Sequence, residues 1–164
     1  MKLETFLLFL LLIAAPGHAQ RDVGKGPDKP APASDISGMY TFLEEGEFVQ
    51  ITIEEPAKVT GFISRYGELP GDKGAFLDQF IKKGTVAGNT LSFVTETLHG
   101  VAYQFKGTVT RGPGKAPGDE SYYVLKGTLT QTTADEQQHT TTHSRQVEFK
   151  SFPQDALPPS SKPD

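Results

Sequence analysis

Apolar and polar residues alternate along most of this chain, which is the pattern of β-strands with one buried and one exposed face. The longest such run is "VAYQFKGTVTR" at 101–111. Six further stretches alternate in the same way: 38–44, 47–55, 58–65, 90–96, 121–131 and 144–152. Short links such as Gly88-Asn89 join neighbouring strands as hairpins and leave no room for the helix of a parallel crossover. The pattern therefore predicts an all-β, antiparallel fold.

One stretch departs from this alternation. In "GAFLDQFIKKG" at 74–84, the apolar residues Phe76, Leu77, Phe80 and Ile81 fall at positions i, i+1, i+4 and i+5. That spacing is typical of one apolar stripe on a short helix. Gly84 would end the helix, after two lysines that suit its C-terminal end. We expect this helix to lie across an open end of the sheet.

Glycines on the apolar face predict how the sheet closes. Gly61, Gly107 and Gly127 each occupy an inward position of their strand. A glycine weakens a strand, but at an inward position it allows a sharp bend or the close approach of another backbone. We therefore predict an antiparallel up-and-down β-barrel of seven to eight strands with one short helix. A two-sheet β-sandwich, which needs fewer bends, is the alternative.

The N-terminus predicts an exported protein. In "MKLETFLLFLLLIAAPGHAQ", the apolar run of residues 6–15 is followed by Pro-Gly and small residues, the layout of a signal peptide cleaved after Ala19. This run has about half of the ~20 residues that a membrane span needs. We expect a signal peptide at 1–19, a disordered linker at 20–37, a barrel domain at 38–152 and a disordered tail at 153–164. The mature chain is expected to be a secreted or periplasmic monomer without membrane insertion.

Composition and motifs exclude several kinds of chemistry. The chain has no cysteine, so thiolate catalysis, disulfides and cysteine-type zinc sites are excluded. Its net charge is −4 and it has no cluster of Lys or Arg, which argues against nucleic acid as a partner. It contains no phosphate-binding loop, dinucleotide fingerprint or Gly-x-Ser-x-Gly elbow. We expect a non-enzymatic protein without catalytic residues or cofactors.

The motif "HTTTH" places His139 and His143 four residues apart, a spacing that would suit one metal ion on a helix. Three consecutive threonines favour a strand or loop instead. In a strand the two side chains stand about 13 Å apart, at ~3.3 Å per residue. We therefore expect a solvated hairpin here and no metal site.

Inward aromatic residues are the candidate binding site. The predicted lining consists of Tyr40, Phe42, Phe93, Tyr103, Phe105 and Tyr123. Apolar walls with a few hydroxyl groups are typical of small-molecule pockets, whereas in a small barrel the same rings can simply fill the interior.

We predict that the barrel binds a small, mostly apolar ligand at its mouth, covered by the loop at 66–75 and the short helix. The alternative is an envelope or extracellular interaction module with a solid core, which binds a protein or glycan through its loops. A hydrolase or isomerase on the same scaffold is the third possibility.

Three segments carry a family resemblance. Gly38-Met39-Tyr40 resembles the Gly-x-Trp that opens a lipocalin barrel, with tyrosine in place of tryptophan. "GNTLSF" followed by "YQFKGTV" resembles a pattern of small secreted bacterial barrel domains. Over 38–152 the chain thus resembles the calycin-type barrels, the lipocalins and avidins, and the resemblance implies architecture only. The chain has no tryptophan, so the aromatic box by which avidins hold biotin has no counterpart.

Overall fold

The computed structural model describes residues 36–135 and 137–154. The expected signal peptide lies outside the described residues, as do 20–35 of the expected linker and 155–164 of the expected tail.

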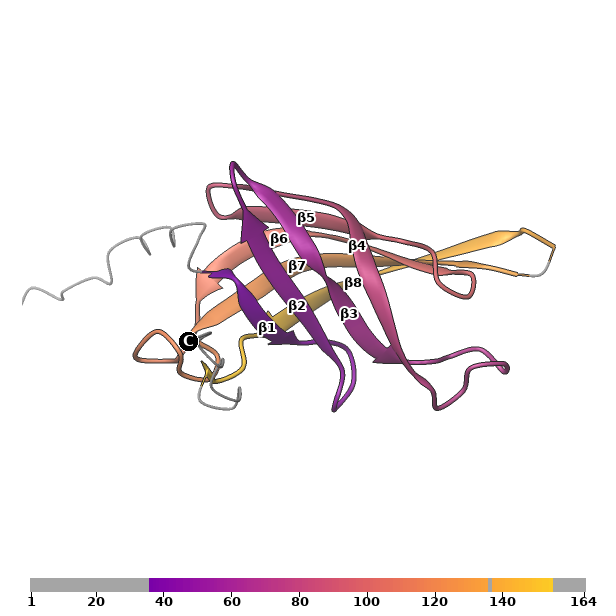
Figure 1. Ribbon diagram of the computed structural model, residues 1–164, viewed down its shortest axis with the longest axis horizontal. Helices are drawn as coiled ribbons and strands as arrows, with labels where there is room; N and C mark the ends of the chain where they lie inside the picture. Colours follow the sequence, from indigo (N-terminus) through magenta and orange to yellow (C-terminus); the bar gives the residue numbers. More distant parts are fainter. Residues whose placement is uncertain (1–35, 136, 155–164) are drawn as a thin grey trace, which may run out of the picture.

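Eight antiparallel strands form a single sheet in which each strand pairs with the next one along the chain (Figure 1). The strands are β1 (Gly38–Thr41), β2 (Phe48–Glu54), β3 (Lys58–Tyr66), β4 (Phe76–Ala87), β5 (Thr90–Thr95), β6 (Val101–Arg111), β7 (Tyr123–Ala134) and β8 (Thr140–Lys150). Two-residue turns such as Gly88-Asn89 set the register of these hairpins. The all-antiparallel, up-and-down topology that the sequence predicts is confirmed.

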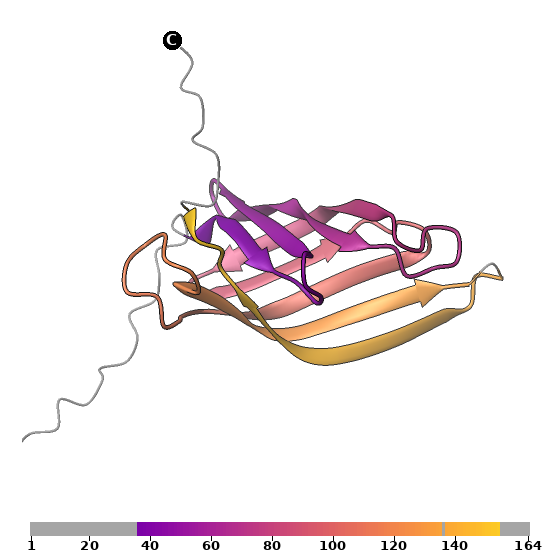
Figure 2. The same cartoon turned by 90° about the horizontal axis from the view of Figure 1, so that it is seen from below.

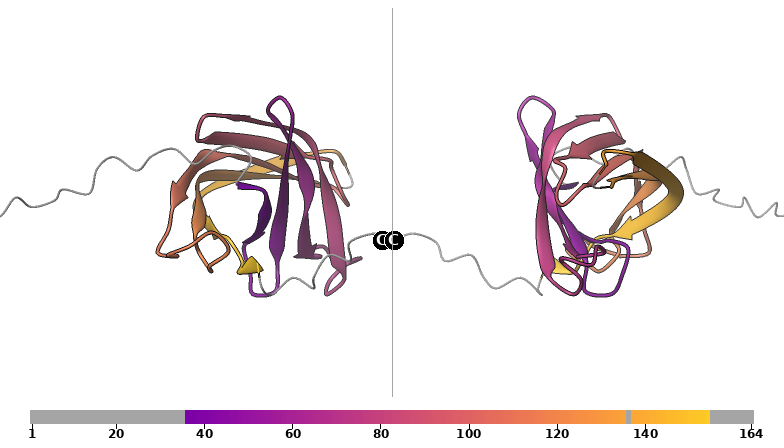
Figure 3. Two further views of the ribbon diagram at one scale, coloured as in Figure 1. Left: turned by 60° about the vertical axis from the view of Figure 1, so that its left-hand side comes forward. Right: turned by 90° about the vertical axis from the view of Figure 1, so that its right-hand side faces the viewer.

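The sheet curls until its first strand meets the end of its last (Figure 3). Tyr40 of β1 pairs with Ser151, which follows β8, and the Phe152 amide donates a hydrogen bond of 2.9 Å to the Met39 carbonyl oxygen. This pairing joins the barrel at one end. At the other end, the long hairpin of β7 and β8 extends beyond the remaining strands (Figures 1 and 2). The curled single sheet confirms the barrel and not the sandwich.

Each inward glycine lies where the backbone of a neighbouring strand comes close. Gly107 and Gly127 are direct partners across β6 and β7. A Cβ atom on Gly127 would overlap the Lys106 carbonyl oxygen and lie 2.5 Å from the Gly107 Cα. A Cβ atom on Gly61, whose φ is +132°, would overlap the Gln50 carbonyl oxygen. The strands can approach and bend at these positions because glycine has no side chain there, as the sequence predicts.

The predicted short helix is wrong, because residues 76–83 belong to strand β4. Phe76 and Phe80 point outward and are exposed, whereas Leu77 and Ile81 are partly buried on the inner side. Apolar residues on both faces of a strand produce the spacing that resembled a helical stripe. A register shift just after Ile81 then returns Gly84 to the interior. The described residues contain no α-helix and therefore no helix that could cross a membrane.

Five aromatic side chains on the outside of β2–β4 contact one another; we call them the outer aromatic cluster. Their ring centres lie 5.1 to 6.4 Å apart along a continuous chain of contacts. The cluster consists of Phe48, Phe62, Tyr66, Phe76 and Phe80. Phe80 is 55% exposed and Phe76 is 49% exposed. A contiguous apolar patch of this kind is uncommon on the surface of a monomer.

Candidate functional site

The six aromatic residues predicted to line a site fill the interior of the barrel. Each is at most 8% exposed and belongs to one hydrophobic core; they are Tyr40, Phe42, Phe93, Tyr103, Phe105 and Tyr123. The rings of Phe42 and Tyr103 meet edge to face at 5.4 Å, and those of Phe93 and Phe105 stack at 5.5 Å. With the middle of the barrel packed in this way, the ends are where a ligand can be received.

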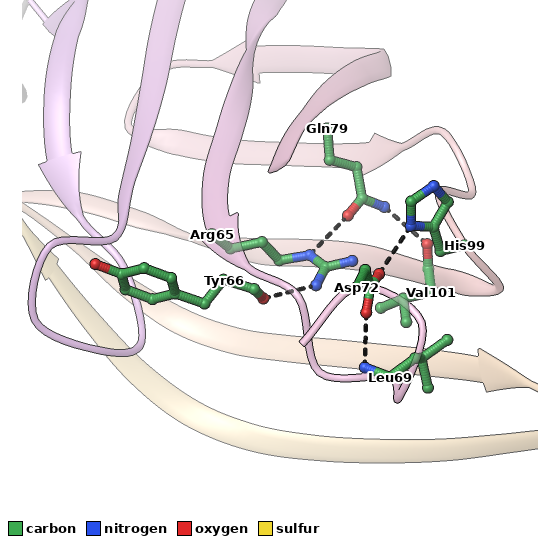
Figure 4. Close-up of polar contacts among 7 residues, drawn as sticks. All are labelled: Arg65, Tyr66, Leu69, Asp72, Gln79, His99 and Val101. Atoms are coloured by element: carbon green, nitrogen blue, oxygen red, sulfur yellow. Dashed lines mark hydrogen bonds and ion pairs between the residues drawn. The ribbon is translucent and has the colours of Figure 1, made fainter. Parts of the chain in front are cut away.

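Polar side chains are buried at the end of the barrel where β3 and β5 finish and β4 and β6 begin. Arg65 follows Ile63 in the alternation of β3, so its side chain points inward, and the residue is only 1% exposed. Its Nε donates a hydrogen bond of 3.0 Å to Gln79 Oε1, and its Nη1 donates one of 3.1 Å to the Tyr66 carbonyl oxygen (Figure 4). A charged side chain is thus held beneath the end of the barrel by neutral partners.

Gln79 connects three strands at this end. Its side-chain amide nitrogen lies 2.7 Å from the Glu96 carbonyl oxygen, 2.8 Å from the Val101 carbonyl oxygen and 3.0 Å from Thr95 Oγ1. The Gln79 side chain therefore donates to the turn between β5 and β6 while it accepts from Arg65. It fixes the position of the guanidinium.

One nitrogen of this guanidinium is unsatisfied. Arg65 Nη2 is the one buried side-chain nitrogen or oxygen of the described residues that has no hydrogen-bond partner. Arg65 Cζ lies 5.5 Å from the centre of the Tyr103 ring, so the charged group packs on one of the predicted lining residues. Leaving a buried donor unpaired costs about 1–3 kcal/mol, and more for a charged group. Such a group calls for a partner that the chain itself does not supply.

The loop at 67–75 covers this end of the barrel. Glu68 accepts a hydrogen bond of 3.0 Å from the Tyr103 hydroxyl and one of 2.9 Å from Gln131 Nε2, and Leu69 packs on the core. A Cβ atom on Gly67 would overlap the Asp72 carbonyl oxygen, so the loop can fold this tightly only with glycine there. The sequence placed a loop at 66–75 over the entrance; the helix expected beside it is a strand.

A second contact fastens the same loop to the turn between β5 and β6. His99 Nδ1 lies 2.8 Å from Asp72 Oδ2, while Asp72 Oδ1 accepts a hydrogen bond of 2.9 Å from the Leu69 amide (Figure 4). His99 and Gly100 form a two-residue turn in which both have positive φ, +49° and +76°. This turn presents the imidazole to the loop. The hydrogen bond with His99 lowers the pKa of Asp72, and the nearby Arg65 charge acts in the same direction.

The depressed pKa of Asp72 predicts that the loop loosens in acid. Because the pKa is lowered from an ordinary value of 3.8, the contact with His99 stabilises the closed loop fully above that pH. It is lost as the pH falls through the lower pKa of the closed state. The amide resonance of Leu69, followed by NMR from pH 6 to pH 2, should therefore shift with a midpoint below pH 3.8.

The Asp72→Asn variant is the control, since it keeps Glu68 but lacks the carboxylate that contacts His99. The part of the Leu69 shift that belongs to Asp72 should be absent from this variant. A wild-type transition that Asp72→Asn leaves unchanged would contradict the assignment to Asp72.

The Tyr103 hydroxyl remains a proton donor. Burial raises its pKa well above the usual range; Arg65 opposes this rise, and the neighbouring Glu68 adds to it. The hydroxyl therefore stays protonated and donates to the carboxylate of Glu68.

Two hollows flank Leu69 of the loop. One, of about 430 Å³, is lined by Leu69, Gln131, Thr133, Ala134, Asp135, His139, Thr141 and His143. The other, of about 590 Å³, is lined by Leu69, Pro70, Gly71, Asp72, His99, Ala134 and Asp135. The first hollow reaches Gln131 and therefore the contact between Gln131 and Glu68. It gives access to the covered end without passage through the core.

The two histidines of the "HTTTH" motif lie on the rim of this first hollow. His139 Nδ1 is 3.1 Å from Asp135 Oδ2, and His143 is exposed on β8. Within the described part of the chain, no three histidine or carboxylate side chains are grouped to hold a metal ion.

The opposite end of the barrel also has a cavity, of about 580 Å³, whose lining includes Tyr40, Asp119, Tyr122 and Tyr123. There the Tyr40 hydroxyl donates a hydrogen bond of 2.6 Å to the Ile36 carbonyl oxygen, and burial raises its pKa. Of the described residues, none at this end has a buried side-chain polar atom without a partner. The end that holds Arg65 is therefore the stronger candidate site.

Sequence reasoning did not find the polar residues of this end, Arg65, Glu68, Asp72, Gln79 and His99. The signal for Arg65 was present, since a charged residue at an inward position of an alternating strand is unusual. The partners of Arg65 come from other strands and gave no local signal.

Comparison with known proteins identifies the architecture. No protein-family model and no curated protein matches the sequence. Among solved structures, rhizavidin in complex with biotin matches with a TM-score of 0.53 and 12% identity, over 75% of this chain and 98% of rhizavidin. Apo short afifavidin matches with a TM-score of 0.52 and 13% identity, over 75% of this chain and 99% of that protein. The chain therefore has the architecture of the avidin-type barrels, within the calycin-type fold.

Proposed function

We propose that this chain is a non-enzymatic binding protein that takes up a small, mostly apolar ligand at the loop-covered end of its barrel. The observation that carries the proposal is the unpaired Nη2 of Arg65, buried beneath that end. The shared architecture supports it, because rhizavidin and short afifavidin have both been crystallised with biotin.

The ligand would enter beside Leu69, through the hollow that reaches Gln131. Leu69 and Ala134 offer apolar contact there, and Tyr103 is the predicted lining residue that the ligand meets first, since its hydroxyl already contacts the loop. Phe42, whose ring meets that of Tyr103 edge to face, would support this floor from below, whereas Tyr40 and Tyr123 of the predicted lining lie at the opposite cavity. Because the core is closed in this structure, binding requires the loop to move outward.

The first test of the proposed function is native mass spectrometry of the mature protein purified from its own compartment. A retained small molecule should appear as a mass increment that is lost on unfolding. The bound fraction should also shift the NMR amide resonances of Leu69, His99 and Gln131. Shifts confined to Met39, Asp119 and Tyr122, at the opposite cavity, would place the site there and contradict the proposal.

We also propose that the chain acts after export, as a secreted or periplasmic protein. The expected cleavage after Ala19 gives the test. The protein recovered outside the cytoplasm should begin at Gln20 by intact mass, whereas an uncleaved intracellular chain would contradict export.

We expect a monomer in solution. The outer aromatic cluster is the exposed apolar surface through which two copies would associate, so the test compares the wild type with a variant of this cluster. Sedimentation velocity at micromolar concentration should give the mass of one chain for the wild type and for Phe80→Ser alike. Phe80 is half exposed, so the substitution should change the free energy of unfolding by less than about 1 kcal/mol. A wild-type dimer that Phe80→Ser dissociates would contradict the monomer and identify the cluster as an interface. Thr52→Ser, on the same outer face of β2, is the control.

The same cluster favours a second candidate function, an interaction module with a solid core. The filled interior fits that alternative, but the exposed rings of Phe76 and Phe80 lie on strand β4 and not on the loops through which the sequence predicted recognition. The two functions are separable, because ligand binding depends on the end of the barrel and protein recognition would depend on the outer face of β2–β4. An empty protein by native mass spectrometry, with no NMR response to small molecules, would favour the interaction module.

A further inference from the structure

We propose that the ligand of this barrel carries a carboxylate, and that in the closed state Glu68 of the loop occupies the place of that carboxylate. The inference rests on the proposed function, which it makes more specific: the ligand class is a small amphiphilic acid. Glu68 then acts as a tethered competitor that leaves when the ligand binds.

The first support is the position of the Glu68 carboxylate. One of its oxygens accepts from the Tyr103 hydroxyl at 3.0 Å, and the other accepts from Gln131 Nε2 at 2.9 Å. Tyr103 and Gln131 are direct partners in the register of β6 and β7, so they form a fixed pair of donors. Two donors at this separation suit the two oxygens of any carboxylate, whether it comes from the loop or from a ligand.

The second support is the charge beneath these donors. The Arg65 guanidinium lies against the Tyr103 ring, with Cζ 5.5 Å from its centre. Its Nη2 still has no acceptor, although Glu68 and Asp72 lie on the covering loop. Glu68 is tethered by the loop and satisfies the two upper donors only. A free acid is not tethered, so it can approach more closely and engage Nη2 as well. The geometry thus leaves Arg65 Nη2, a donor that Glu68 does not use, for the carboxylate of a ligand.

The third support is the residue next to Glu68. Leu69 packs on the core beneath the loop and separates the two hollows. The loop therefore places an apolar side chain and a carboxylate side by side over the mouth. An acid with a short apolar chain has the same two parts, and it would replace both Leu69 and Glu68 when the loop opens. A purely apolar ligand would leave Tyr103 and Gln131 without their acceptor.

The route of entry fits an acid. The hollow beside Gln131 has His139 and His143 on its rim. Asp135, the acidic residue among its lining residues, is paired with His139 at 3.1 Å. An incoming carboxylate therefore meets imidazole groups and not an unpaired acid.

The test measures binding of hexanoate and hexan-1-ol, two probes that share the apolar chain and differ in the charged group, by isothermal titration calorimetry. The wild type should bind hexanoate weakly, because Glu68 competes. Glu68→Ala should bind hexanoate about ten-fold more tightly, since one charge-assisted hydrogen-bonding position is vacated. Its affinity for hexan-1-ol should change less than two-fold. Glu120→Ala removes an equal charge from the exposed loop between β6 and β7, at the opposite end of the barrel, and it should leave both affinities unchanged.

Two further variants, made in the Glu68→Ala background, test the donors. Tyr103→Phe keeps the ring and removes the hydroxyl, and it should lower hexanoate affinity about ten-fold while hexan-1-ol affinity is retained. Arg65→Lys should also reduce the preference for the acid, because a lysine cannot reproduce the fork of the guanidinium. Circular dichroism confirms that each variant is folded, and Tyr103→Phe keeps the test decisive if Arg65→Lys does not fold.

The outcomes separate the inference from the proposed function. If Glu68→Ala binds both probes equally, or gains no affinity for hexanoate, the acid inference is wrong while binding at the mouth stands. If neither probe binds any folded variant and the purified protein carries no small molecule, the proposed function itself fails. A gain for hexanoate that Tyr103→Phe removes supports both.

Discussion

Replacing Gly127 with alanine should lower the free energy of unfolding by about 3 kcal/mol. The new Cβ would overlap the Lys106 carbonyl oxygen and lie 2.5 Å from the Gly107 Cα. Both neighbours are backbone atoms, so relief requires β6 and β7 to separate. Urea unfolding followed by circular dichroism measures the loss.

Gly71→Ala is the matched control for this experiment. Gly71 lies in the loop at 67–75, where an added Cβ atom meets nothing within 4 Å and φ is not positive. We expect its free energy of unfolding to stay within about 0.5 kcal/mol of the wild type. If Gly127→Ala were equally mild, the bend between β6 and β7 would not depend on missing side chains, and the reason given for barrel closure would be wrong.

Replacing Gln79 with leucine should have a similar effect, again a loss of about 3 kcal/mol in the free energy of unfolding. Leucine has a similar volume, so the loss comes from hydrogen bonds and not from a cavity. The carbonyl oxygens of Glu96 and Val101 would lose their donor, and Arg65 Nε would lose its acceptor. Gln79 is 1% exposed, so water does not replace these partners unless the site opens.

Two comparisons make this prediction specific. Gln104→Leu, on the exposed side of β6, changes the same chemical group without these contacts and should alter stability by less than about 0.5 kcal/mol. Gln79→Glu can still accept from Arg65 but cannot donate to the two carbonyl oxygens. Its loss in the free energy of unfolding should therefore fall between those of Gln79→Leu and Gln104→Leu. A Gln79→Leu variant as stable as Gln104→Leu would show that the buried polar group does not hold this end together.

Much of the fold is encoded locally. The period-two alternation of stretches such as 101–111 reports that one face is buried, because successive side chains of a strand point to opposite sides. Short turns such as Gly88-Asn89 restrict each strand to its neighbour in sequence. Gly61, Gly107 and Gly127 lie at inward positions of their strands. An inward position without a side chain allows the sheet to bend, and the sheet can then close into a barrel. These features need no knowledge of distant residues, and the prediction of an antiparallel barrel was correct.

The error at 76–83 shows where local pattern fails. Phe76 and Phe80 are apolar although they point outward, where Phe80 contacts Phe62 of β3 and Phe76 contacts Tyr66. The alternation rule assumes a polar outer face, so apolar residues on both sides of β4 gave the spacing of a helix. Only pairing with β3 and β5 determines that this segment is extended.

The sequence by itself determined the antiparallel topology and the bends of the sheet, because both follow from residues adjacent or two apart in the chain. It could not determine the polar end of the barrel. Tyr103 reaches Glu68 across 35 positions, and His99 reaches Asp72 across 27. Such contacts exist only after the sheet has curled, when strand ends that are far apart in sequence meet around one opening. The tertiary structure therefore decided which charged groups face one another there, and with them the chemistry of the candidate site.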